Sequence, residues 1–260
     1  MTLSMRGALR TFNRGTEDER IALDRIDLDV AERDVVVIIG SNGAGKSTLL
    51  NAITGQLALD SGTILIDGEA VERQPEQRRA RLIARVAQDP MRGTFPTLTL
   101  AENLVLADLR SRPRGLRPAL GRARVERFEA VLSRFGLGLE KRLGTRVGTL
   151  SGGQRQVLAL AMAVLNPPRL LLLDEHTAAL DPRTAALVMA ATFRAIADGG
   201  LTALMVTHNM QQAIDHGNRL LMMDAGRIVL DLDAEQKAAM TVAGLVARFQ
   251  VADDKLLLQT

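Results

Sequence analysis

The residues with the clearest chemical potential form a glycine-rich run from Gly40 to Ser47, GSNGAGKS, with Thr48 next. The spacing G-x-x-x-x-G-K-S is typical of a loop whose backbone N–H groups surround phosphates and whose lysine adds positive charge. A continuous apolar strand, Val35 to Ile39, precedes the run, and a helical pattern follows it. Since a helix that begins at the loop also favours an anion, this order predicts a nucleotide site. We expect Lys46 on the β and γ phosphates and Ser47 on magnesium; a chance glycine turn is the alternative.

Two carboxylates end a second apolar run, LLLLDE, which extends from Leu170 to Glu175. Because ligands of a parallel sheet bind at the carboxyl ends of its strands, we expect both acids beside the phosphate loop. Asp174 is predicted to orient magnesium, and Glu175 to polarise the attacking water as a general base. A helix cap or a salt bridge is the alternative role for acids at such a strand end.

A third segment, LSGGQ from Leu150 to Gln154, precedes a helical stretch that reaches Leu165. Ser151 and the two glycines place a hydroxyl and several N–H groups at a helix N-terminus, which is a second potential anion site. Two anion sites in one chain are explained if each nucleotide lies between the loop of one copy and this segment of another. The simpler alternative is that Ser151 only caps its helix.

The pattern of apolar residues predicts an α/β fold with an inserted helical region. Alternation between Ile21 and Val30 indicates a pair of strands with one buried face, and residues 98–165 have helical periodicity. Short apolar runs separated by helical segments then indicate the βαβ order of a parallel sheet. These runs are Leu170 to Leu173, Ala203 to Val206 and Arg219 to Met223, followed by a hairpin at Ala225-Gly226 and a helix near Val242 to Phe249.

Composition excludes several classes of protein. The 260 residues include no cysteine, so disulfides, thiolate metal sites and thiol nucleophiles are excluded. A net charge of +3, from 33 basic and 30 acidic residues, does not indicate a nucleic-acid partner. The start MTLSMRGALR lacks the apolar core of a secretory signal, and no apolar run approaches the length of a membrane span. We expect an intracellular protein that reaches a membrane only through a partner.

Two arginine-rich stretches, Arg73 to Arg85 and Arg110 to Arg124, have no catalytic pattern. We expect solvated faces, the second of them an exposed connection rich in proline and glycine. The alternative is that they contact anionic lipid headgroups or a membrane subunit.

The order GSNGAGKST, LSGGQ and LLLLDE closely resembles the pattern of the ABC ATPases, and the resemblance covers essentially the whole chain. It implies a single nucleotide-binding domain over 1–260, with a RecA-like P-loop core, an N-terminal antiparallel β subdomain and a helical subdomain inserted at about 98–165. It also implies ATP and Mg²⁺ as ligands, and dimerisation of two copies head to tail around two ATP molecules.

The resemblance assigns further roles one residue at a time. Gln88 in VAQDP resembles the glutamine that contacts magnesium and water and moves with the membrane partner. Asp181 in ALD resembles the loop that crosses the dimer interface, and His208 in VTHNM the histidine that contacts the γ-phosphate. Phe12, in a loop ahead of the N-terminal strand, resembles the aromatic that stacks on adenine; core packing is its alternative. His176 departs from the family pattern, in which proline follows the glutamate.

These considerations give three groups of site residues. The expected catalytic residues are Glu175, His208 and Gln88, and the expected metal-binding residues are Ser47, Gln88 and Asp174. The expected nucleotide-binding residues are Phe12, Gly40, Ser41, Asn42, Gly43, Ala44, Gly45, Lys46, Ser47, Thr48, Ser151, Gly152, Gly153, Gln154 and Asp181.

A narrower resemblance concerns direction and partners. The segments TFNRGT, QDPMRGT and DEHTAALDP are similar to those of ATP-binding subunits of tryptophan/tyrosine-type bacterial importers, in which the histidine after the glutamate is usual. This implies ATP-driven uptake of an amino acid or similar solute, with transmembrane permease subunits and a solute-binding protein as partners. The expected location is peripheral, at the cytoplasmic face of the inner membrane. An ABC exporter subunit and a soluble non-transport ABC ATPase are the alternatives.

Overall fold

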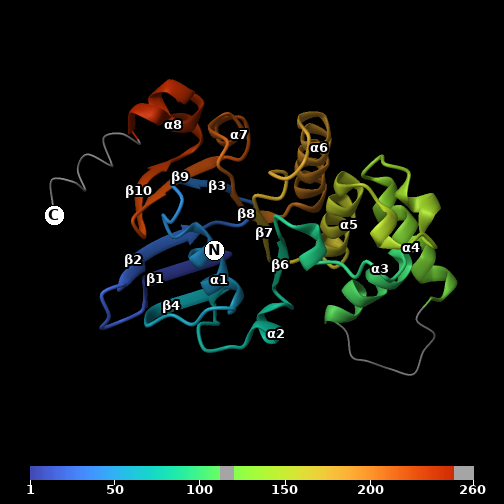
Figure 1. Cartoon of the computed structure of the whole chain (residues 1–260), viewed down its shortest axis with the longest axis horizontal. Helices are drawn as coiled ribbons and strands as arrows, with labels where there is room; N and C mark the ends of the chain where they lie inside the picture. The colour runs from blue at the N-terminus through green and yellow to red at the C-terminus, as the bar shows by residue number, and fades with distance from the viewer. Residues whose placement is uncertain (112–119, 249–260) are drawn as a thin grey trace. The chain divides into compact units, whose positions relative to one another are not determined.

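The computed structural model describes residues 1–111 and 120–248, which form two compact units (Figure 1). Unit 1 combines Met1–Arg79 with the segment that begins at Thr202, and unit 2 is Ala80–Leu201. Most of the connection that we expected within Arg110 to Arg124 lies outside the described residues, as does Phe249 at the end of the last expected helix.

The first sheet of unit 1 is antiparallel, with the order β2-β1-β4-β5. The long strands β1 and β2 pair from Leu3 opposite Val30 to Phe12 opposite Arg20. Register shifts interrupt this pairing, and Ile21 is 46% exposed although it belongs to the apolar alternation. The bounds are β1 Leu3–Phe12, β2 Arg20–Val30, β4 Ser61–Ile66 and β5 Glu69–Ala70.

Two expectations for this sheet were wrong. We expected a pair of strands within Ile21 to Val30, but these residues belong to a single strand. Its partner is β1, a strand that was not predicted from the sequence. Phe12 is therefore the last residue of a strand and not part of a loop ahead of the first strand. The cause is that β1 carries arginines, glycine and serine among its apolar residues, which obscures the alternation.

Unit 1 also holds the strand that leads into the glycine-rich loop. This strand, β3 (Val35–Gly40), pairs in parallel with β8 (Thr202–Val206) and β9 (Arg219–Asp224). Val36 to Ile39 are buried, as expected for a strand flanked on both sides. The remaining elements are β10 Arg227–Leu232, antiparallel to β9, the helices α1 Lys46–Thr54, α2 Glu76–Arg79, α7 Met210–Asp215 and α8 Ala234–Ala238, and a helical segment at 242–248.

The described part of unit 2 is mainly helical, and in it β6 (Ile83–Val86) pairs in parallel with β7 (Leu170–Asp174). The first four residues of β7 are fully buried leucines, so Asp174 and Glu175 directly follow an apolar, buried segment. The helices are α3 Leu100–Asp108, α4 Arg122–Ser133, α5 Gly152–Val164 and α6 Pro182–Gly199, with short 3-10 turns at Pro90–Arg92, Leu109–Ser111, Leu139–Arg142 and Val147–Thr149.

Side-chain caps fix where three of these helices begin. Thr99 and Ser151 each form a capping box with the residue three positions later, and Asp181 accepts a hydrogen bond from the Thr184 N–H. A cap of this kind stabilises a helix by about 1 kcal/mol. The caps therefore set the starts of α3, α5 and α6.

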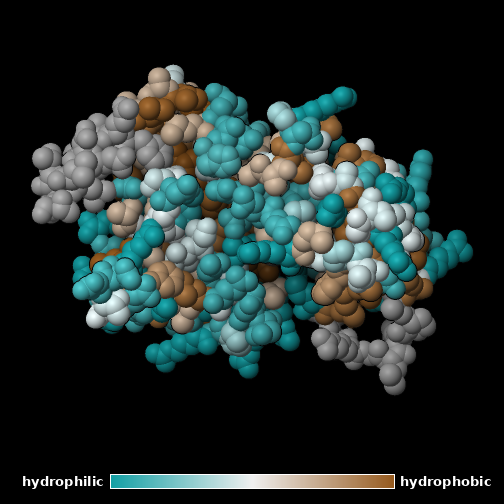
Figure 2. All heavy atoms as spheres, in the orientation of Figure 1, coloured by the Kyte–Doolittle hydropathy of each residue, from teal (hydrophilic) through white to brown (hydrophobic). Residues whose placement is uncertain are grey.

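Hydrophilic side chains are spread over the visible face, and a group of apolar ones lies over α3, on which Leu106 is 43% exposed (Figure 2). None of the helices that the structure describes combines the length and the apolar character needed to cross a bilayer.

Two arginines that we expected on a solvated face are not solvated. Arg79 is 2% exposed and donates to the carbonyl oxygens of Ala52 and Ile53 at the end of α1. Arg85 is also largely enclosed, and its guanidinium pairs with Asp174. Both side chains bind partners that are distant in the sequence, which charge patterning alone does not show.

Candidate active site

The glycine-rich loop connects β3 to α1 and is shaped by close backbone contacts. Gly40, Gly43 and Gly45 all have positive φ angles, and Gly45 directly precedes α1. A Cβ atom would lie 2.3 Å from the Met223 carbonyl oxygen at Gly40, and 2.3 Å from the Ala22 carbonyl oxygen at Gly45. No other residue type fits either position, because its side chain would collide with rigid backbone.

Lys46 lies inside this loop. Its Nζ donates hydrogen bonds to the carbonyl oxygens of Gly40 at 2.7 Å and Ser41 at 2.8 Å, and the residue is only 8% exposed. The ammonium group is thus held at the centre of a glycine-lined turn at the start of a helix. This arrangement is suited to binding phosphate oxygens.

The hairpin after β9 supports the loop from within unit 1. Ser41 Oγ donates to Asp224 Oδ1 at 3.2 Å, and the Gly226 N–H donates to the Ala44 carbonyl at 3.0 Å. Asp224 is 7% exposed, and its Oδ2 has no hydrogen-bond partner among the described residues. Asp224 was missing from the sequence-based site, because nothing local links it to a loop 183 residues away.

Phe12 and His208 lie in the same unit as the loop. Phe12 pairs across the strands with Arg20, whose guanidinium donates to the Gly43 carbonyl, and the Arg10 guanidinium lies 5.0 Å from the Phe12 ring centroid. His208 is exposed two residues past the end of β8, which runs parallel to β3. In unit 1, His208 therefore follows the same end of the parallel strands as the loop, and Arg20 links Phe12 to the loop at Gly43.

The acidic pair lies in unit 2 at the end of β7. Asp174 Oδ2 accepts from Arg85 Nη2 at 2.6 Å, and both side chains are partly buried. Glu175 has a φ of 45°, an uncommon backbone conformation for a residue other than glycine. Glu175 therefore adopts a left-handed backbone conformation directly after the end of β7.

His176 follows directly and is buried. Its Nε2 lies 3.0 Å from Thr192 Oγ1 on α6, and Thr192 Oγ1 donates to the Val188 carbonyl at 2.9 Å. Burial lowers the pKa of His176 to about 4, so the ring is neutral at pH 7. A neutral histidine thus connects the segment after Glu175 to a buried residue of α6 through a hydrogen bond.

The LSGGQ segment also has an internal role. Ser151 Oγ accepts a hydrogen bond from the Gln154 N–H at 3.3 Å. Ser151 thus caps α5, which was the simpler role considered for it. A Cβ atom on Gly153 would lie 2.2 Å from Thr184 Cγ2, so this glycine lets α5 approach α6 closely. The cap leaves the anion-binding prediction open, because a capped helix start still presents N–H groups.

Gln88 and Asp181 occupy exposed positions in unit 2. Gln88 follows β6, and the preceding Ala87 carbonyl accepts from Gln156 Nε2 on α5 at 3.1 Å. Asp181 caps α6, and its hydrogen bonds with Thr184 lower the pKa of the carboxyl. The buried Gln156, another residue that sequence reasoning missed, ties the segment before Gln88 to the helix that begins after Ser151.

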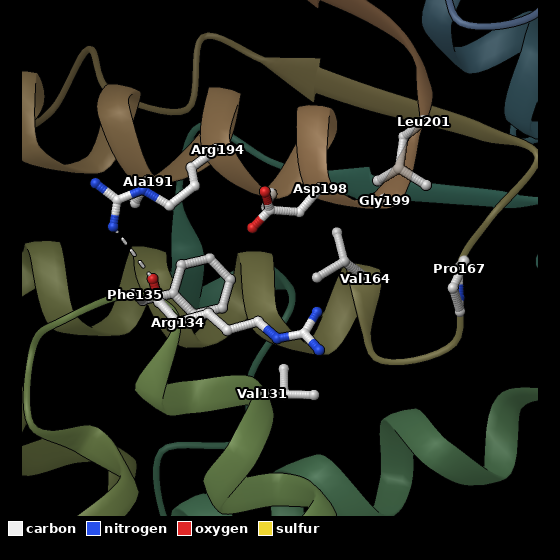
Figure 3. Close-up of a pocket in the computed structure, with 11 residues that line it drawn as sticks. Val131, Arg134, Phe135, Val164, Pro167, Ala191, Arg194, Asp198, Gly199 and Leu201 are labelled. Atoms are coloured by element: carbon white, nitrogen blue, oxygen red, sulfur yellow. Dashed lines mark hydrogen bonds between the residues drawn. The ribbon is translucent and has the colours of Figure 1, made fainter.

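A separate pocket lies among α4, α5 and α6 (Figure 3). Its lining combines apolar residues such as Phe135 and Leu201 with the exposed charges of Arg134, Arg194 and Asp198. Arg194 donates a long hydrogen bond to the Arg134 carbonyl at 3.5 Å. None of the expected site residues lines this pocket.

The expected residues are divided between the units. Unit 1 holds Phe12, residues 40–48 and His208, and unit 2 holds Gln88, Asp174, Glu175, residues 151–154 and Asp181. The glycine turn around Lys46 fits a polyphosphate, and the hydroxyl of Ser47 and carboxylate of Asp174 are oxygen ligands of the kind that Mg²⁺ prefers.

Comparisons with known proteins agree with this geometry. The family model described as ABC transporter matches residues 23–178. The tyrosine transport ATP-binding protein of Clostridioides difficile is 39% identical over 96% of this chain and 99% of its own length. The lipoprotein-releasing system ATP-binding protein LolD of Roseobacter denitrificans is 36% identical over 87% of this chain and 96% of its own. The dimeric, post-hydrolysis structure of the ATP-binding cassette MJ0796 bound to ADP and Pi has a TM-score of 0.76 at 28% identity, and covers 89% of this chain and 98% of that one.

Proposed function

The chain belongs to the ABC transporter family and is an ATP-binding, ATP-hydrolysing subunit; from this premise we propose that it powers a bacterial importer of an amino acid or similar small solute. The observation that supports this proposal is the near full-length similarity to a tyrosine transport ATP-binding protein. The importer-type segments TFNRGT and DEHTAALDP support the same reading.

In the proposed mechanism, unit 1 binds the nucleotide. The backbone N–H groups of residues 40–48 and the Lys46 ammonium bind the β and γ phosphates, and Phe12 stacks on adenine. His208 contacts the γ-phosphate from the end of β8. Lys46 is ready for this role because the loop carbonyls already hold its ammonium group within the turn.

The residues of unit 2 carry out the hydrolytic step. Glu175 accepts a proton from the attacking water. The water oxygen bonds to the γ-phosphorus while the bond from that phosphorus to the β,γ-bridging oxygen breaks, and ADP leaves with the bridging oxygen. Gln88 positions that water. Ser47, Gln88 and Asp174 would hold Mg²⁺, which when bound would neutralise charge on the phosphate oxygens. Ser151 to Gln154 and Asp181 act toward the nucleotide of a second copy, so two copies bind two ATP molecules.

The proposed partners follow from this cycle. Permease subunits convert ATP-driven dimerisation into movement of the solute, and a solute-binding protein delivers it. The chain then lies peripherally at the cytoplasmic face of the cell membrane.

The first test is to compare the unaltered protein with Glu175→Gln. Magnesium-dependent ATP hydrolysis and the oligomeric state with ATP would be measured on the same samples. We expect turnover only in the unaltered protein and an ATP-bound dimer in the variant. If neither protein binds ATP or dimerises, the proposed mechanism is wrong for the isolated chain.

The similarity to a lipoprotein-releasing subunit favours one other function, extrusion of a lipid-linked cargo. The two functions separate in the complex with the permease, reconstituted in vesicles. Import predicts that a solute-binding protein loaded with an amino acid stimulates ATP hydrolysis. Stimulation by a lipoprotein alone would instead identify a release system.

A further inference from the structure

An arginine occupies the position next to the proposed magnesium-orienting acid. Arg85 Nη2 lies 2.6 Å from Asp174 Oδ2, and the two side chains are 20% and 15% exposed. The residues come from neighbouring parallel strands, with Arg85 opposite Leu172 in the register. The pair therefore lies at the strand end that carries both Asp174 and Glu175.

This location makes the carboxylate costly without a counter-charge. Behind Asp174 lie four fully buried leucines, and the next residue is another carboxylate. An enclosed carboxylate with no cation nearby would be destabilised by desolvation and by repulsion from its neighbour. The Arg85 guanidinium supplies the missing positive charge.

We propose that Arg85 is a positioning residue that holds Asp174 in the metal-free protein and yields that carboxylate to the divalent cation that arrives with ATP. This inference rests on the proposed role of Asp174 toward magnesium. A guanidinium next to the carboxylate repels an incoming cation, and repulsion is strong in a partly enclosed site. Arg85 thus lowers the affinity for the metal and provides a partner for Asp174 after the metal leaves.

The test measures metal binding without turnover. Binding of Mn²⁺, followed by the paramagnetic resonance of the free ion, would be titrated in the presence of a non-hydrolysable ATP analogue. The variants are Arg85→Met, Arg85→Gln as a second neutral side chain, and Arg85→Lys, which keeps the charge. Arg81→Met is the matched control, because Arg81 is exposed, lies in the same segment and forms no ion pair among the described residues.

The expected result is that the neutral variants bind Mn²⁺ roughly tenfold more tightly, whereas Arg85→Lys and Arg81→Met stay close to the unaltered protein. The neutral variants should also melt at lower temperature in EDTA and recover with Mn²⁺ and the nucleotide analogue. Unchanged or weaker Mn²⁺ binding in both neutral variants would show a purely structural ion pair and overturn the proposal. If the unaltered protein binds the nucleotide but no Mn²⁺, the role of Asp174 fails as well.

Discussion

The glycines of the phosphate loop are required because each turn brings its backbone against another part of unit 1. Gly45 combines a φ of 102° with the contact to the Ala22 carbonyl, so both conformation and space exclude a side chain. Lys46 depends on this geometry, since the carbonyl oxygens of the loop hold its ammonium group. The backbone shape of the loop therefore also determines where the Lys46 ammonium group lies.

Gly45→Ala should lower the free energy of unfolding by about 2 kcal/mol or more, because the left-handed conformation costs about 1 to 2 kcal/mol and the Cβ contact adds to it. It should also weaken ATP binding. Urea unfolding and nucleotide titration would measure both effects. Gly144→Ala is the control, because a Cβ there meets nothing within 4 Å; equal behaviour of the two variants would contradict the prediction.

His176 should make stability depend on pH. Its folded pKa of about 4 lies below the usual 6.5, so the unfolded chain takes up a proton first as the pH falls. The stabilisation is fully present above pH 6.5 and is lost as the pH falls toward 4, by about 1.4 kcal/mol per pH unit. Urea unfolding at pH 7 and 5.5 should show a loss about 1 kcal/mol larger in the unaltered protein than in His176→Gln. Equal losses would show that His176 titrates normally.

At the scale of single elements, caps determine where helices start, whereas buried contacts determine where the helices pack. Arg79 Nη1 donates to two carbonyl oxygens at the end of α1, while Nε and Nη2 bind the carbonyls of Gln74 and Glu72. In unit 2, Gly153 brings α5 against Thr184 of α6. These contacts set the positions of α1, which begins at Lys46, and of α5, which begins at Gly152.

Arg79→Met should destabilise the protein by about 3 kcal/mol, because several buried carbonyl groups lose their donors at once. Burial also lowers the pKa of Arg79, which indicates how enclosed the guanidinium is. Chemical denaturation would measure the loss. The neighbouring Arg78→Met removes the same charge from an exposed position and should change stability by less than about 0.5 kcal/mol.

Gly153→Ala should cost about 1 to 3 kcal/mol, since the new Cβ would overlap Thr184 Cγ2. Thr184→Ser removes that methyl group and keeps the hydroxyl, so the double variant should recover much of the loss. A thermodynamic cycle of unfolding energies would measure the coupling. Additive losses would show that the two helices do not contact each other through this pair.

At the scale of the whole molecule, each unit holds a different part of the predicted site. Unit 1 carries the phosphate loop, and unit 2 carries the acids and the LSGGQ segment. The family described as ABC transporter includes a dimeric neighbour with bound ADP and Pi, which supports the proposed two-copy cycle.

For Glu175→Gln with magnesium and ATP, the melting temperature should rise with protein concentration, because a dimer that binds ATP links folding to association. Without ATP it should be independent of concentration. Calorimetry over a hundredfold range of protein would measure this. If the melting temperature of a Lys46→Ala/Glu175→Gln double variant rose equally with protein concentration, dimerisation would not depend on phosphate binding, which would contradict the proposed mechanism.

The sequence alone was sufficient to assign the family and to predict the main chemical groups. The phosphate loop, LSGGQ and LLLLDE are contiguous segments, and their chemistry depends on residue types at fixed spacing, so a linear reading finds them. The strands at Val35 to Ile39 and Leu170 to Leu173 were predicted for the same reason, because a continuous apolar run is itself the signal, although Val35 is only partly buried. Strand β1 was not predicted, because polar residues and glycine interrupt its apolar alternation.

The contacts between the predicted site residues and distant parts of the chain became visible in the folded structure. Arg85 with Asp174, and Ser41 with Asp224, are separated by 89 and 183 residues. His176 meets Thr192, and Arg79 meets the end of α1, through folding of the chain and not through any local pattern. Such contacts depend on which strands pair and which helices pack together. The sequence therefore predicts the reacting groups, and the fold shows which distant side chains contact them.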